Sequence, residues 1–412
     1  GAPEVGDAAE PTPHNPRADA LLRRLIGHAL RSRCSDVHLE MLQQGLSVRY
    51  RVDGVLRPPH FGDLQEALDL GAREIVSRIK VLARLDIAER RRPQDGSFRF
   101  ALDPDHPAAS DLRVSILPTY TGESVVIRLL DGRLAPRSIG DLDLSPDVAA
   151  GVDRILDRSS GIFLVTGPTG SGKSTTLYAC LCRLHRPEIR ILTAEDPVEY
   201  VYDGLSQCEV RGEIGNTFAR LLRSFLRHDP EVIMVGEIRD EDTAQMAFRA
   251  AQTGHLLLST LHTNTALSAL SRLVDLGVDR ALIGASLAGV MSQRLVRRLC
   301  LACRQPAEST PDLVSEFFPH GSRPAALTFY RAVGCADCGF TGYRGRQIVA
   351  DLWTPDEADA ARIRAGAPFD ELHRGALRTT VRMADDARAR LAAGTTTMEE
   401  LRRALPCEAI GA

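Results

Sequence analysis

The stretch from 161 to 176, GIFLVTGPTGSGKSTT, joins an apolar strand to a glycine-rich turn and a potential helix. The turn fits the pattern G-x-x-x-x-G-K-S/T, in which glycines let successive backbone N–H groups face a phosphate chain. Lys173 would place a positive charge at the β- and γ-phosphates, and the Ser174 hydroxyl would bind Mg²⁺. The following helix adds its positive N-terminal end beneath the anion. We therefore expect a nucleoside triphosphate and Mg²⁺ to bind at Gly167, Pro168, Thr169, Gly170, Ser171, Gly172, Lys173, Ser174 and Thr175.

The segment from 231 to 240, EVIMVGEIRD, is an apolar strand that leads into an acid, Glu237. In proteins with this phosphate-binding loop, an acid at this place holds Mg²⁺ through water or polarises the attacking water. The alternative is a surface acid that follows a buried strand. The sequence contains no LSGGQ-like segment, which counts against a transporter ATPase of the ABC class. Glu237 is therefore the candidate catalytic carboxylate.

Two Cys-x-x-Cys pairs, Cys300 with Cys303 and Cys335 with Cys338, form a second group of potential ligands. Four thiolates can occupy the corners of a tetrahedron, which is the closed arrangement of a structural zinc site. Because no ligand position is left open, we expect the zinc to stabilise and shape the chain rather than to catalyse. The alternative is four unrelated thiols. The other cysteines have no partner pattern and are expected to be packed or incidental: Cys34, Cys180, Cys182, Cys208 and Cys407.

The composition describes an ordinary globular protein of more than one domain, with 412 residues, 44% of them hydrophobic and 25% charged. A formal net charge of −3 gives no general attraction to nucleic acid or anionic lipid. No apolar stretch approaches the length of a transmembrane helix, and no signal-peptide pattern is present in the sequence. Nine cysteines, an odd number, argue for a reducing compartment. We expect a cytoplasmic protein.

The order of patterns along the chain predicts two main domains. The first has an amphipathic helix from Asp19, alternating strands around 35–59, a helix over 64–82, and strands at 113–117 and 124–130. From 146, short apolar strands alternate with helices, which is typical of a mostly parallel sheet covered on both faces. The expected boundaries are a disordered tail at 1–18, an α+β domain at 19–131, a linker at 132–145, an α/β domain at 146–296, a four-cysteine insert at 297–346 and a helical part at 347–412.

Seven blocks of the sequence, in order, resemble the secretion ATPases of type II secretion systems and type IV pilus assembly, and the type II enzymes most of all. They are SDVHLE at 35–40, RPQDGSFR at 92–99, LRVSILPTYTGESVVIRLLD at 112–131, the phosphate-binding loop, ILTAEDPVEY at 191–200, LRHDPEVIMVGEIRD at 226–240 and TGHLLLSTLHTNTA at 253–266. The resemblance covers nearly all of the chain from about residue 19 to residue 403.

This resemblance implies a RecA-like P-loop ATPase domain with a zinc insert, preceded by a smaller PAS-like α+β domain. It implies a homohexameric ring at the cytoplasmic face of the inner membrane, where ATP hydrolysis powers assembly of a pseudopilus or pilus. Inner-membrane components of the machine would be the partners. Larger relatives carry a further N-terminal docking domain, and retraction ATPases generally lack the four cysteines.

The resemblance also assigns roles to individual residues. Glu195 and Asp196 would face Mg²⁺ and the γ-phosphate with Glu199 in support, although Asp196-Pro197 also fits a simple turn. His262, with His255 seven residues before it, would sense the γ-phosphate, whereas histidines beside a buried strand are otherwise usually packing residues.

Arg113 and Arg128 would reach the nucleotide when the first domain closes on the second. On sequence alone, both are equally well read as solvated charges on a strand. Whether they would act on their own chain's nucleotide or on a neighbour's is open.

Three other functions remain open. The chain could serve a type IV pilus or a competence pilus, and the sequence does not distinguish these systems from secretion. A nucleic-acid motor would need a basic path with aromatic side chains, and only 5% of the residues are aromatic. The last alternative is a scaffold that binds a nucleotide without hydrolysing it.

Overall fold

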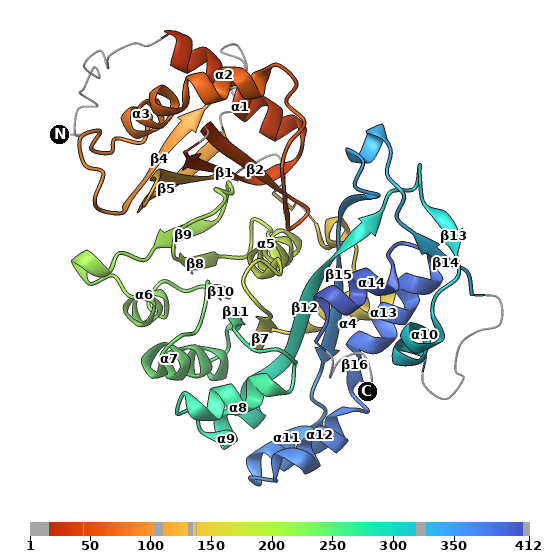
Figure 1. The fold of residues 1–412 in the computed structure, drawn as a ribbon. Helices are drawn as coiled ribbons and strands as arrows, with labels where there is room; N and C mark the ends of the chain where they lie inside the picture. The colour runs from red at the N-terminus through yellow and green to blue at the C-terminus, as the bar shows by residue number, and fades with distance from the viewer. Residues whose placement is uncertain are drawn as a thin grey trace. The chain divides into compact units, whose positions relative to one another are not determined.

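The computed structural model describes residues 16–43, 45–101, 110–130, 135–136, 138–318 and 327–406. The chain divides into two compact units, Gly1–Leu134 and Ala135–Ala412 (Figure 1).

The first unit is an antiparallel sheet of six strands, in the order β3-β2-β1-β6-β5-β4, with three helices packed on it (Figure 1). Alternate strand residues such as Val37 and Leu39 are buried against the helices, as a half-covered sheet requires. The elements are α1 Pro16–Arg31, β1 Cys34–Leu42, β2 Gly45–Val52, β3 Val55–Arg57, α2 Leu64–Leu70, α3 Ala72–Leu82, β4 Gln94–Phe100, β5 Ser110–Thr119 and β6 Gly122–Leu130.

The structure replaces the single helix expected over 64–82 with α2 and α3, which meet at Gly71. Gly71 has φ −102° and ψ 13°, so the chain leaves the helical conformation there. A Cβ atom at this position would lie 2.7 Å from Cδ1 of Leu21 in α1. The glycine therefore allows the junction to pack closely on α1, a contact that helical periodicity does not reveal.

The second unit is built on a sheet of eight strands, in the order β16-β15-β12-β7-β11-β10-β8-β9. The six strands from β12 to β9 are parallel, and β15 and β16 are antiparallel to their neighbours. The strands are β7 Gly161–Thr166, β8 Ile191–Glu195, β9 Ser206–Glu209, β10 Val232–Val235, β11 Leu256–Leu261, β12 Leu287–Leu299, β15 Tyr343–Trp353 and β16 Thr380–Val381.

Helices cover both faces of this sheet, and successive strand residues are buried on opposite faces. In β7, Ile162 and Leu164 pack against one layer of helices, whereas Phe163 and Val165 pack against the other. The expected fold class, an α/β unit after a smaller α+β unit, is confirmed. The covering helices are α4 Pro146–Leu156, α5 Lys173–Leu184, α6 Phe218–Phe225, α7 Glu241–Gln252, α8 Ser268–Asp275, α9 Arg280–Ser286, α11 Glu357–Arg364 and α12 Phe369–Ala376.

The four-cysteine segment connects β12 to β15, two adjacent antiparallel strands of the main sheet. The part expected to be helical from 347 begins inside β15, because the run QIVADLW is buried as a sheet strand. Helices α13 Met383–Ala392 and α14 Met398–Ala404 then pack over β12 and β15. Within the segment lie β13 Gln305–Ala307, α10 Pro311–Phe317, β14 Phe329–Arg331 and the 3₁₀ turn η5 Ala336–Cys338. Among the described residues, no helix is long and apolar enough to span a bilayer.

Candidate nucleotide site and four-cysteine site

The loop between β7 and α5 has the backbone conformation that its glycines allow. Gly167, Gly170 and Gly172 have φ values of 142°, 77° and 89°, which side chains other than hydrogen rarely tolerate. A Cβ atom at Gly167 would also lie 2.5 Å from the carbonyl oxygen of Gln293. The loop is therefore shaped both by its own glycines and by its contact with β12.

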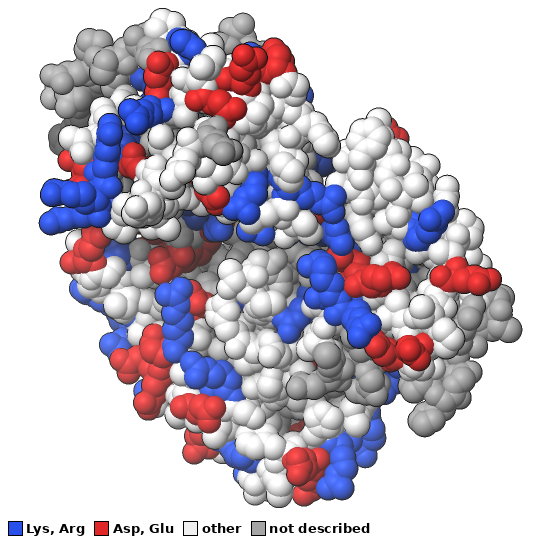
Figure 2. All heavy atoms as spheres, viewed as in Figure 1, with Lys and Arg blue, Asp and Glu red and all other residues white. Residues whose placement is uncertain are grey.

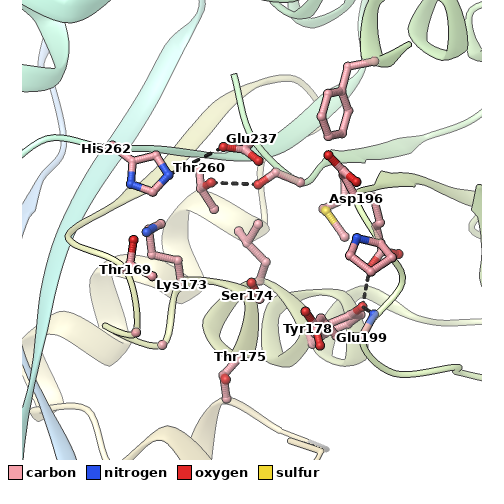
Figure 3. A pocket seen from close by; sticks show the side chains of 18 residues that line it. Thr169, Lys173, Ser174, Thr175, Tyr178, Asp196, Glu199, Glu237, Thr260 and His262 are labelled. Atoms are coloured by element: carbon pink, nitrogen blue, oxygen red, sulfur yellow. Dashed lines mark hydrogen bonds and ion pairs between the residues drawn. The ribbon is translucent and has the colours of Figure 1, made fainter. Parts of the chain in front are cut away.

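A cavity of about 310 Å³ opens beside this loop, at the edge of the sheet where β7, β8, β10 and β11 end (Figure 3). Lys173 and Ser174 lie on one side of it, opposite Glu237, Thr260 and His262 (Figure 3). Of the loop residues expected to bind nucleotide, Gly167, Pro168 and Ser171 do not line the cavity. Other loop residues and the candidate acids and histidine from the sequence analysis do line it: Thr169, Gly170, Gly172, Lys173, Ser174, Thr175, Glu195, Asp196, Glu199, Glu237 and His262.

Lys173 folds back on its own loop. Its Nζ donates hydrogen bonds to the carbonyl oxygens of Gly167, at 2.9 Å, and Pro168, at 3.1 Å. Burial lowers the pKa of Lys173, and the charge of Glu237 opposes this shift. A phosphate chain would give the ammonium group a stronger partner than neutral carbonyls. The arrangement therefore suits a lysine that binds an anion.

Glu237 follows β10 and lies between two potential cations. Its Oε1 pairs with Arg239, and its Oε2 lies 3.5 Å from Nε2 of His262. Arg239 also lies 3.8 Å from Asp196. The Glu237 side chain is only 14% exposed, with one oxygen toward Arg239 and the other toward His262. Together with Ser174 and Asp196 it offers oxygen ligands, the kind that Mg²⁺ prefers.

Glu195 ends β8 and is more buried than expected for a residue that faces a metal, at 4% exposure. Its oxygens accept hydrogen bonds from Thr193, at 2.6 Å, from Gln207, at 3.0 Å, and from the hydroxyl of Tyr178. Burial raises the pKa of Tyr178, which keeps this hydroxyl protonated as a donor. Glu195 thus ties β8 to α5, and Asp196 is the more open acid of the pair.

The two histidines of the block at 253–266 lie at different places. His262 follows the carboxyl end of β11 and lines the cavity. His255 precedes the same strand, where its Nδ1 lies 2.9 Å from the carbonyl oxygen of Ala250. The structure therefore brings His262 and not His255 to the candidate site.

Gln293 was missed by the sequence reasoning. This residue of β12 is fully buried, and its Nε2 donates to the carbonyl oxygen of Ser171 at 2.7 Å. Its Oε1 accepts from the Thr176 hydroxyl in the first turn of α5 at 2.8 Å. The Gln293 side chain therefore holds the second half of the phosphate-binding turn and the first turn of α5 to β12. The available signal was a polar pair, Gln293-Arg294, in an otherwise mostly apolar strand.

Arg113 and Arg128 belong to the first unit, whereas the cavity is built from the second. They are directly opposite each other on β5 and β6, so they share a face of the sheet. Asp36 on β1 is the next residue in this row, and its Oδ1 lies 3.0 Å from Nε of Arg128. Arg51 on β2 lies 3.6 Å from the other oxygen of Asp36. The Asp36 carboxylate thus lies between two arginines, Arg128 and Arg51.

The four cysteines expected to bind zinc are gathered at one point, with all four Sγ atoms within 4.8 Å of one another. Sγ atoms of Cys300 and Cys335 are 3.8 Å apart, and those of Cys303 and Cys338 are 3.9 Å apart. Tetrahedral zinc with Zn–S bonds of about 2.3 Å requires sulfur separations of about 3.8 Å. Although burial opposes it, backbone N–H groups lower the pKa of the Cys338 thiol, which favours the thiolate. The thiols therefore fit a closed zinc site.

Comparison with known proteins agrees with this fold. Residues 14–403 match the family described as type II/IV secretion system protein. The chain belongs to this family, as the sequence blocks indicated.

Within the family, type II secretion proteins are prominent among its relatives. The chain is 45% identical over 384 residues to the type II secretion system protein E of Pseudomonas aeruginosa, covering 93% of this chain and 74% of that protein. It is 44% identical over 383 residues to the type II secretion system ATPase E of Vibrio cholerae, with the same coverage. The type IV pilus assembly ATPase PilB of Myxococcus xanthus is 40% identical over 407 residues, which are 97% of this chain and 69% of PilB.

Solved structures support the same fold. The pilus retraction motor PilT with bound ADP superposes with a TM-score of 0.61 at 25% identity, covering 93% of this chain and 96% of PilT. The Legionella pneumophila ATPase DotB gives a TM-score of 0.66 at 20% identity, covering 96% of both chains.

Proposed function

We propose that this chain hydrolyses ATP and that the energy drives addition of pilin-like subunits to a pseudopilus in type II secretion. The observation that carries the proposal is the cavity in which Lys173 and Ser174 face Glu237 and His262 (Figure 3). The relatives named as type II secretion proteins and ATPases support the assignment to secretion.

The chemistry proposed is positioning and charge neutralisation, with little covalent work by the protein. Lys173 and the loop N–H groups would hold the β- and γ-phosphates. Mg²⁺ bound through Ser174, and through water to Glu237 or Asp196, would neutralise phosphate charge when present. Glu237, oriented by Arg239 and His262, would accept the proton of the attacking water.

The same proposal includes the assembly. Six chains would form a ring at the cytoplasmic face of the inner membrane, bound to inner-membrane components of the machine. Residues 19–131 would act as a closing domain, with Arg113 and Arg128 delivered to the phosphates. Residues 300–338 would hold a structural zinc ion through the four cysteines.

The test is Mg²⁺-dependent phosphate release by the purified, assembled chain, with Lys173→Ala at the same concentration. We expect turnover by the parent and none by the variant. Equal rates in the two proteins would remove the proposed role of this cavity. No turnover by the assembled parent would remove the proposal and favour a nucleotide-binding scaffold.

Two further measurements separate the alternatives. Lys and Arg are interspersed with Asp and Glu on the face shown in Figure 2. The formal net charge of −3 gives no general attraction to nucleic acid either. DNA and RNA at low salt should therefore leave the rate unchanged, and stimulation would indicate a nucleic-acid motor. The similarity to PilB keeps pilus assembly as the second candidate. Complementation of a secretion-deficient strain and of a pilus-deficient strain distinguishes these two.

A further inference from the structure

The loop that carries His262 is held from the side by strands β12 and β15. After β11 the chain runs through Asn264, whose carbonyl oxygen accepts a hydrogen bond from Ser292 Oγ at 3.0 Å. The N–H of Ala266 donates to Asp351 Oδ2 at 3.3 Å. The third contact comes from Arg294, whose Nη2 donates to Asn264 Oδ1 at 3.1 Å. Residues 262–266, the His262 loop, are thus fixed by side chains more than 25 positions away in sequence.

Burying the charged guanidinium group of Arg294 to make this contact costs free energy. The residue is only 7% exposed, and its Nη1 is buried without a hydrogen-bond partner among the described residues. Burial lowers the pKa of Arg294, and attraction to Asp351 opposes this. Burial in turn raises the pKa of Asp351 to about 7, so this acid does not fully compensate the arginine near neutral pH. An apolar side chain of similar volume would fill the space at lower cost.

Gln293 and Arg294 are successive residues of one strand, and they hold different parts of the candidate site. Gln293 is bonded to the phosphate-binding turn, and Arg294 is bonded to the His262 loop. Successive side chains of a strand point to opposite faces, which is why one strand can hold both loops. The alignment of His262 with Glu237 therefore depends on β12 as well as on β11.

We propose that Arg294 is a positioning residue that acts through Asn264 to hold His262 in register with Glu237. The inference rests on the proposed ATP hydrolysis at this cavity. It predicts that loss of Arg294 lowers turnover and leaves nucleotide affinity nearly unchanged, because binding depends on the phosphate-binding turn and Lys173. It also predicts that Arg294 has no effect on turnover once His262 is gone.

The experiment is a double-mutant cycle on the full chain, with Arg294→Gln, His262→Ala and the combination. We expect kcat of Arg294→Gln to fall about 10- to 100-fold, the loss of one charge-assisted hydrogen bond. Affinity for a non-hydrolysable ATP analogue should stay within about twofold. In the His262→Ala background, Arg294→Gln should cause no further loss of kcat.

Two controls keep the outcome interpretable. Arg297→Gln removes an arginine of the same strand, 12% exposed and paired with Glu400 at 2.6 Å, and should lower thermal stability without the loss in kcat. Asn264→Ala removes the acceptor and leaves the Arg294 charge in place, so it serves if Arg294→Gln does not fold. It should reproduce the loss in kcat.

The inference is overturned by losses that add in the double variant, by analogue affinity that falls as far as kcat, or by parental turnover in Arg294→Gln. Activity that survives Lys173→Ala would instead overturn the proposed function, so the two failures are distinguishable.

Discussion

His255 and His262 stand at opposite ends of the same buried strand, β11, and of the two only His262 lines the cavity. His262 has Nε2 3.5 Å from a carboxylate oxygen of Glu237, whereas Nδ1 of His255 lies 2.9 Å from the carbonyl oxygen of Ala250. A strand of six residues extends about 20 Å. The two side chains therefore cannot contact the same phosphate, although both belong to the sequence block at 253–266 that was expected to sense the γ-phosphate.

This separation predicts different effects of the same substitution. We expect His262→Ala to lower kcat about 10- to 100-fold, because it removes the imidazole that lies 3.5 Å from the Glu237 carboxylate, the proposed general base. His255→Ala is the matched control and should turn over at nearly the parental rate, with a small loss of thermal stability. Steady-state ATP hydrolysis is measured for both variants. Equal losses of kcat would contradict the prediction that only His262 acts at the cavity.

Glu237→Gln should abolish hydrolysis and leave ATP bound. The amide keeps the size of the side chain but cannot accept the proton of the attacking water, so we expect a loss of about 10²- to 10⁴-fold in kcat. The control is Glu231→Gln, because Glu231 directly precedes the amino end of the same strand, β10. This variant should turn over like the parent. Turnover and ATP affinity are measured separately, and parental turnover by Glu237→Gln would refute the assignment.

Gln293→Leu should weaken nucleotide binding. Leucine fills a similar volume but leaves the Ser171 carbonyl and the Thr176 hydroxyl without their partner, each at a cost of about 1–3 kcal/mol. Gln347→Leu, a buried glutamine on β15 bonded to Thr395, is the matched control and should lower stability alone. Calorimetric titration with ADP compares the two, and equal affinities would argue against a role for Gln293 in shaping the turn.

The phosphate-binding turn was predictable because its residues are contiguous and each glycine has a backbone reason to be there. Alternating strands and helices likewise predicted the fold class of the second unit, since the buried strands read as short apolar runs. Gln293 and Arg294 were not predictable, because they reach the site through strand order, and β12 lies beside β7 only in three dimensions. The split of helix 64–82 depends in the same way on Leu21, 50 residues before Gly71.

Arg113→Ala and Arg128→Ala should bind ATP nearly normally and lose turnover. An arginine that neutralises phosphate charge in the transition state is worth about 10³- to 10⁵-fold. Mixing Arg113→Ala with Lys173→Ala chains then tests whether Arg113 acts on its own chain's nucleotide or on a neighbour's. Recovered activity requires action across subunits. Parental rates in both single variants, measured on assembled protein, would show that neither arginine acts on the nucleotide.

Elemental analysis should find about one zinc per chain. Cys335→Ser should lower both the zinc content and the melting temperature, because metal binding contributes to folding. Cys208→Ser, a half-buried cysteine outside the cluster, is the control and should keep the metal. A parent free of zinc, or a Cys335→Ser variant that melts like the parent, would remove the structural role.

Among the residues that the structure describes, the buried apolar core of the first unit lies within residues 21–129, and the cores of the second unit lie within 139–405. Side chains that share no core do not have to lose their packing together. Heating should therefore melt the chain in two cooperative transitions rather than one. A cavity made in the first core, for example by Ile75→Ala, should move one transition and leave the other in place. A nucleotide that binds at the phosphate-binding turn should raise the melting temperature of the second unit's transition and leave that of the first unit unchanged.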